Sequence, residues 1–199
     1  VLEIRRRALA PAPQAVWFLP GTEPLRARGL AHEHAGRYPE MLAAHLEVLK
    51  RLPDVGRAWN DVGHAYALLG DPQNTYTYLE RFARGGMFDT LNIPELGDAA
   101  LQLNRLDTAA RALEEALQRY PDQAGAIRVK LAQVFAQLGL RAQAARQFGR
   151  AKALVEKGKA FLAGLPERSM NSTVDQLRQE ALVALSRLEA ELPAPREAP

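Results

Sequence analysis

Glycine residues recur along this chain at a spacing of 34 residues. A step of 34 links two series of positions, which are Gly29, Gly63 and Gly97, and then Gly36, Gly70 and Asn104. Asparagine tolerates the left-handed backbone that glycine adopts easily, so Asn104 continues the second series as a turn residue. A period of 20 to 50 residues is typical of chains that fold by stacking repeated units.

Each unit divides into two amphipathic segments separated by a turn. In the second unit, Ala58–Leu69 and Gln73–Ala83 flank the turn residues Gly70, Asp71 and Pro72. Asp71 is a good N-cap, and proline suits the first position of a helix. A fourth unit follows one residue out of step, with Gly139 expected in the turn. One helix pair cannot bury its apolar face alone, so the pairs are expected to stack.

The second unit also carries a recognisable motif. Its segment WNDVGHAY, from Trp59 to Tyr66, matches the signature W-x2-L-G-x2-Y with valine in the leucine position. The small and large residues expected in the second helices are Ala109 and Leu113 in the third unit, and Ala144 and Phe148 in the fourth, with Pro121 closing the third unit. The chain therefore resembles the tetratricopeptide repeat family, with units at 22–55, 56–89, 90–123 and 125–158. The resemblance implies an all-α, right-handed superhelical solenoid.

The segments outside these units are expected to close the solenoid. Residues 1–21 are predicted as a short helix followed by a proline-rich extended stretch. Its Trp17 and Phe18 either cover the first unit or occupy the groove. Residues 159–192 are predicted as a helix extension, a loop and a capping helix whose capping box starts at Thr173. Residues 193–199 are expected to form a disordered tail. Asn92 and Pro94 predict a late, short first helix in the third unit.

Composition narrows the chemistry that the chain can perform. There is no cysteine, the net charge is only +3, and no apolar run approaches the roughly 20 residues of a membrane span. His32 and His34 would point roughly 200° apart on a helix, so they cannot share a metal ion. The only serines, Ser169, Ser172 and Ser186, lack a nucleophile context. We therefore expect no metal, no cofactor and no enzyme, and a cytoplasmic location.

In the resembled family, the first helix of each repeat lines a concave groove that binds protein or peptide. Transferred position by position, the expected partner-binding residues are Arg26, Glu33, His34, Arg57, Asn60, Asp61, His64, Glu95, Asp98, Gln102, Lys130, Gln133 and Gln137. Their charges are mixed, which favours an extended or helical peptide with a complementary pattern. If His34 and His64 lie close together, binding would be sensitive near pH 6.5.

Other functions are also compatible with these patterns. The chain could be a regulatory or sensory domain of a larger protein. Helical-repeat binding to RNA would use a basic end that includes Arg5, Arg6, Arg7 and Arg26. Homo-oligomers would form if Tyr76, Tyr78 and Phe82 left an aromatic patch on the outer surface. The leading hypothesis is a non-enzymatic adaptor that binds protein.

Overall fold

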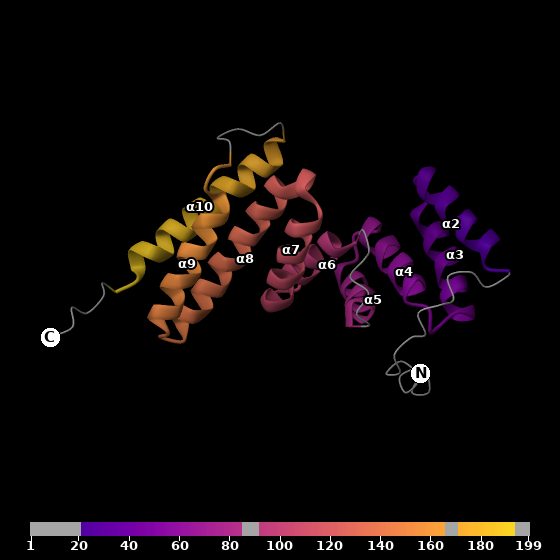
Figure 1. The fold of residues 1–199 in the computed structure, drawn as a ribbon, viewed down its shortest axis with the longest axis horizontal. Coiled ribbons are helices and arrows are strands. Elements are labelled where there is room, and N and C mark those ends of the chain that lie inside the picture. The colour runs from indigo at the N-terminus through magenta and orange to yellow at the C-terminus, as the bar shows by residue number, and fades with distance from the viewer. Residues whose placement is uncertain (1–20, 85–91, 166–170, 194–199) are drawn as a thin grey trace. The chain divides into compact units, whose positions relative to one another are not determined.

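The computed structural model describes residues 21–84, 92–165 and 171–193. Within these ranges every regular element is helical and no strand forms, which confirms the predicted all-α class. The helices belong to two compact units, residues 1–103 and residues 104–199 (Figure 1). The predictions for Trp17 and Phe18, for most of the N-terminal segment and for residues 194–199 of the tail lie outside the described residues.

The described part of the first unit contains five helices. They are α2 (Glu23–His34), α3 (Tyr38–Arg51), α4 (Gly56–Leu68), α5 (Pro72–Arg84) and α6 (Ile93–Gln102). Each packs against the next along the chain. Asp71 caps α5 as predicted, because its Oδ1 accepts a hydrogen bond from the backbone N–H of Asn74 at 3.0 Å. Helix α6 starts late, after Asn92, and has only 10 residues, which confirms the predicted short helix.

The second unit is built around one long helix. Its elements are α7 (Leu106–Arg119), the 3-10 turn η1 (Pro121–Gln123), α8 (Ala124–Ala144), α9 (Phe148–Leu162) and α10 (Ser172–Glu191). Helices α7, α9 and α10 all pack against α8, which has 21 residues. The cap of α10 is Asn171 and not the predicted Thr173. The Asn171 Oδ1 accepts from the N–H groups of Thr173 at 3.0 Å and Val174 at 3.3 Å, so the helix begins two residues earlier than that box implies.

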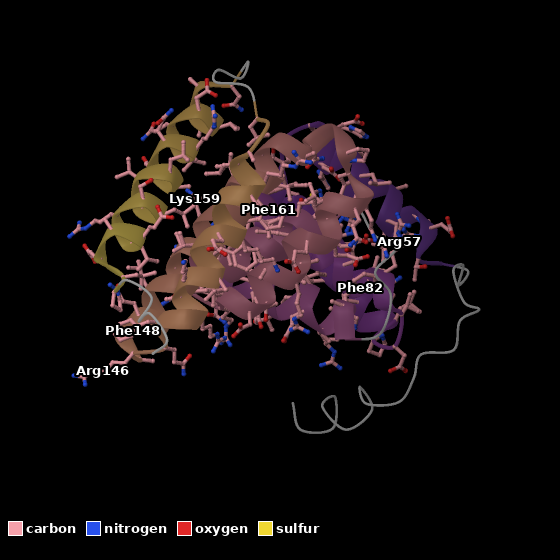
Figure 2. The ribbon with its side chains drawn as sticks, turned by 60° about the vertical axis from the view of Figure 1, so that its left-hand side comes forward. Arg57, Phe82, Arg146, Phe148, Lys159 and Phe161 are labelled. Atoms are coloured by element: carbon pink, nitrogen blue, oxygen red, sulfur yellow. The ribbon has the colours of Figure 1, made fainter. Side chains whose placement is uncertain are left out.

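The turns inside the helix pairs share one backbone conformation. Gly36, Gly70 and Asn104 have φ angles of 68°, 70° and 57°, and each lies two residues before the next helix. The predicted turn series is therefore confirmed at these three positions. The fourth member is Arg146, with a φ of 57°, and α9 starts two residues later at Phe148. Figure 2 shows Arg146 and Phe148 at this turn.

The prediction that Gly139 forms the fourth turn is wrong. Gly139 is buried inside α8, and a Cβ placed there would lie 2.6 Å from Leu188 Cδ2 of α10. It stands seven residues before Arg146, as Gly29 and Gly63 stand seven before their own turns. Gly139 therefore belongs to the glycine series at which a neighbouring helix packs closely, and the fourth turn lies seven residues later than predicted.

The same shift corrects two core assignments in the second unit. Ala109 and Leu113 of α7 are fully buried, as predicted. In the fourth unit Ala144 is exposed and Phe148 is 40% exposed, so neither holds the predicted core position. The corresponding buried residues lie seven positions later, at Ala151 and Val155, which are 0% and 1% exposed.

The aromatic side chains of α4 and α5 do not form the predicted outer patch. Tyr76 and Phe82 are buried, each 7% exposed. Tyr78 lies between Trp59 and Tyr66, with ring centroids 5.4 Å from each. The Arg81 guanidinium covers the Trp59 ring at 4.0 Å from its centroid. These rings therefore stabilise the α4–α5 pair, and the aromatic argument for self-association fails.

Gly63→Ala is expected to lower the free energy of unfolding by about 1 to 3 kcal/mol through overpacking. A Cβ on Gly63 would lie 2.5 Å from Cδ2 and 2.6 Å from Cγ of Leu79, which is only 2% exposed. The control is Gly125→Ala in α8, where a Cβ meets nothing within 4 Å. That change should be neutral or stabilise by up to about 1 kcal/mol. Urea unfolding followed by circular dichroism measures both, and equal stability of Gly63→Ala and wild type would contradict the close packing.

Candidate partner-binding face

Three helices of the first unit bring predicted partner-binding residues together at His64. The Nδ1 atom of His64, on α4, lies 2.8 Å from Oε1 of Glu95 on α6. Its Nε2 atom lies 3.3 Å from Oε1 of Glu33 on α2. One imidazole thus links three helices that are separate in sequence. We call the surface formed by Arg26, Glu33, Arg57, Asn60, Asp61, His64, Glu95 and Asp98 the first-helix face.

A second set of charges lies beside this link. Asp61 Oδ2 is 3.6 Å from Nε of Arg26, and Asp61 Oδ1 is 3.8 Å from Nε of Arg57. The Asp61 carboxylate is 15% exposed, whereas Arg57 is half-exposed. Two cations therefore surround one acid here, while Glu33 and Glu95 surround one imidazole. The first-helix face has the mixed charge that the sequence predicts.

The surroundings of His64 fix its charge. The hydrogen bond with Glu95 is the largest cause that raises the pKa of His64 to about 9, and the charges of Glu95 and Glu33 act in the same direction. Burial acts in the opposite direction but lowers the pKa by less than these interactions raise it. At neutral pH the ring is an imidazolium that donates both N–H groups. The predicted titration of a His34–His64 pair near pH 6.5 is therefore wrong for His64, and His34 lies exposed near the end of α2.

A second histidine lies beneath the face and behaves in the opposite way. His45 of α3 is 3% exposed, and its ring packs so close to Gly29 that a Cβ there would lie 2.5 Å from Cε1. Burial lowers the pKa of His45, although the charges of Asp61 and Glu33 oppose that shift. His45 therefore acts as a neutral core residue.

Two buried acceptors of the first-helix face have no hydrogen-bond partner among the described residues. They are Oδ1 of Asn60 and Oε2 of Glu95. Asn60 is only 6% exposed. A buried acceptor without a donor costs about 1 to 3 kcal/mol. Both atoms are shielded from solvent, so a bound molecule can donate to them only if the surrounding side chains move.

A pocket of about 220 Å³ adjoins Glu95. Its walls include Leu68 and Pro72, and its polar lining includes Glu95, Asp98 and Gln102. Lysine and arginine side chains bury an aliphatic stem while keeping the charged end near polar groups. The pocket therefore suits a basic side chain of a partner.

The remaining predicted residues belong to the second unit. Lys130 and Gln133 of α8 are half-buried, and Gln137 is exposed. Asp61 and Glu95 each stand nine residues before their turn, and Gln137 stands nine residues before Arg146. Because the fourth turn lies seven residues later than predicted, Gln137 and not Lys130 corresponds in position to Asp61 and Glu95.

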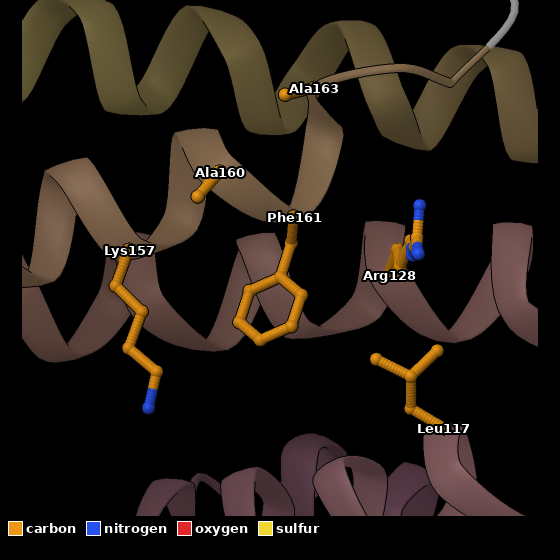
Figure 3. Close-up of a pocket in the computed structure, with 6 residues that line it drawn as sticks. All are labelled: Leu117, Arg128, Lys157, Ala160, Phe161 and Ala163. Carbon is orange, nitrogen blue, oxygen red and sulfur yellow. The ribbon is translucent and has the colours of Figure 1, made fainter.

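The sequence analysis missed a second pocket, of about 380 Å³, in the second unit. Figure 3 shows it, with the Phe161 ring between Lys157 and Leu117. Arg128, Ala160 and Ala163 complete the lining. These residues come from three helices and form no local motif, so only their packing could reveal the pocket.

The described residues contain no group of three His, Asp or Glu side chains arranged to hold a metal ion. None of their helices is long and apolar enough to cross a membrane.

Comparison with known proteins bears on the fold. No family model matches the sequence, and no curated protein sequence matches it. The structure is similar to a crystal structure of MamA protein, with a TM-score of 0.50 and 19% identity over 88% of this chain and 98% of that one. It is also similar to MamA 41-end from Desulfovibrio magneticus RS-1, with a TM-score of 0.51 and 17% identity over 88% and 99% of the two chains. The chain has a helical-repeat fold. At these identities the likeness shows the fold alone.

Proposed function

We propose that this protein is a non-enzymatic scaffold of the tetratricopeptide-like type that binds a protein partner through the first-helix face. The observation that carries the proposal is the link of three helices by His64, beside buried acceptors of Asn60 and Glu95 that lack donors. A face whose charges are fixed before binding loses little conformational freedom when a partner arrives.

The chemistry of the face favours an extended peptide. The Asn60 side chain would turn outward on binding, and its Oδ1 would then accept a backbone N–H, which requires no particular side chain. The pocket beside Glu95 and Asp98 would take a lysine or arginine side chain. Arg57, which is half-exposed, would attract an acidic residue of the same peptide. Such a site recognises a pattern of charges along the peptide. We also propose that the protein is cytoplasmic, because a chain without cysteine needs no oxidising compartment.

Affinity capture from source-organism lysate at two salt concentrations tests the proposal. We expect wild type to retain a protein that Asn60→Ala/His64→Ala/Asp98→Ala loses. The matched control is Glu47→Ala/Arg51→Ala, which removes an exposed ion pair of α3 outside the face and should retain the partner. Because Asn60 and His64 also support the fold, Arg57→Glu is a second variant that leaves the buried network in place. It should weaken capture at least several-fold at low salt.

The outcomes separate the alternatives. Capture that survives both Arg57→Glu and the triple variant would reject the first-helix face as the binding site. Nucleic acid recovered by wild type only at low salt would favour RNA binding instead, because phosphate contacts are strongly salt-dependent.

A further inference from the structure

The pocket of the second unit exists because α8 is unusually long. Helices α2 and α4 have 12 and 13 residues, whereas α8 has 21. The added residues lie at its start and include Arg128. Helices α7 and α9 both pack against α8, and Leu117 of α7 and Phe161 of α9 line the space together with Arg128 (Figure 3).

An aromatic stack forms one wall of this pocket. The rings of Phe161 and Phe135 are 5.7 Å apart between centroids and tilted by only 8°. Phe135 is buried at 4% exposure, so it holds Phe161, which is half-buried, in place. The rest of the lining is Leu117, Ala160 and Ala163 with two cations. The wall can therefore pack against a large apolar side chain.

The charges at the pocket are predominantly positive. Arg128 forms no ion pair with any described residue. Lys157 Nζ lies 4.5 Å from the Phe135 centroid and pairs with Glu114 at 2.7 Å. Both members of that pair are more than one-third exposed, and exposed pairs contribute little to stability. A second carboxylate could thus approach Arg128 and share Lys157.

We propose that this pocket binds an acidic and apolar peptide segment of a protein partner. A large apolar side chain packs against Phe161 and Leu117, and a neighbouring carboxylate pairs with Arg128. A nucleic acid fits less well, because the lining offers two cations, one already paired with Glu114, and otherwise apolar side chains. The inference is independent of the first-helix face, which lies in the other unit.

Nuclear magnetic resonance titration of the ¹⁵N-labelled full chain tests this site. The probe is the blocked peptide Gly-Glu-Phe-Glu-Leu-Gly, and its counterparts are Gly-Gln-Phe-Gln-Leu-Gly and an oligouridylate. We expect saturable shifts of the Arg128, Lys157 and Phe161 amide signals with the acidic peptide, and at least tenfold weaker binding of the glutamine peptide. Arg128→Glu should weaken binding of the acidic peptide at least tenfold, and so should Phe161→Ala. The matched control Arg150→Glu, an exposed residue of α9 outside the pocket, should change it less than twofold.

Four results would overturn the proposal. The first is the absence of saturable shifts in wild type, and the second is equal binding of the acidic and the glutamine peptide. The third is binding of the acidic peptide by Arg128→Glu that equals binding by wild type. The fourth is tighter binding of the oligouridylate at the same amides, which would make the pocket a nucleic-acid site. Arg128 is not a core residue, so its variant keeps the test valid if Phe161→Ala unfolds.

Discussion

Leu185→Ala should lower the free energy of unfolding of the second unit by about 2 to 5 kcal/mol. Leu185 of α10 is fully buried, in a cluster that includes Val129, Ala132 and Val155. Its methyl groups lie 2.9 and 3.2 Å from where a Cβ of Gly158 would stand, so they fill the space that this glycine leaves on α9. Alanine would open a cavity where α10 meets α8 and α9. Urea unfolding followed by circular dichroism measures the loss.

Val183→Ala is the matched control on the same helix. Val183 is 66% exposed, and substitution of an exposed side chain changes stability by about 0.5 kcal/mol or less. If Leu185→Ala were no more damaging than Val183→Ala, α10 would not be part of the folded core. The expected contrast therefore tests whether α10 is part of the packed core of the second unit.

The turns were predictable because they depend on local backbone chemistry. Gly36, Gly70 and Asn104 tolerate positive φ, and few other residues do. Asp71 and Pro72 likewise signal a helix start through their own hydrogen bonding and ring geometry. Features of this kind need no knowledge of the rest of the fold.

The position of the fourth unit was not predictable in the same way. Its true turn residue, Arg146, carries no sequence signal, because it adopts the left-handed conformation without being glycine or asparagine. A shift of seven residues is nearly two helical turns of 3.6 residues, so the apolar face looks the same in both readings. Hydrophobic periodicity therefore cannot distinguish a fourth unit in which Gly139 is the turn residue from one in which Gly139 lies inside a helix and contacts its neighbour. A Cβ clash with Leu188 distinguishes them only in three dimensions.

The candidate site shows the same division. Glu33, His64 and Glu95 were selected from sequence because first-helix positions can be transferred one by one. The sequence does not predict their mutual contacts. It predicts His34 beside His64, whereas the structure places the carboxylates of Glu33 and Glu95 there. The pocket at Phe161 depends on an extended α8 and on helices far apart in sequence, which no local pattern encodes.

The first unit should lose stability as the pH rises from about 6.5 to about 9, and His64 is the cause. The pKa of His64 is 6.5 in the unfolded chain and about 9 in the folded one. Below pH 6.5 the ring is charged in both states, so its bonds to Glu95 and Glu33 contribute fully. Above pH 9 it is neutral in both states and that contribution is lost. The difference corresponds to at most about 3 kcal/mol.

Trp59 fluorescence reports this loss, because its ring packs inside the first unit against Tyr78. A Trp17→Phe background removes the only other tryptophan from the signal. His64→Gln cannot gain the charge, so it should be less stable than wild type at pH 6 and should approach wild type at pH 9. The control His34→Gln changes an exposed histidine and should keep the wild-type pH dependence. If His64→Gln kept the full slope between pH 6.5 and 9, another group would be responsible, and the charged link between α2, α4 and α6 would lose its stabilising role.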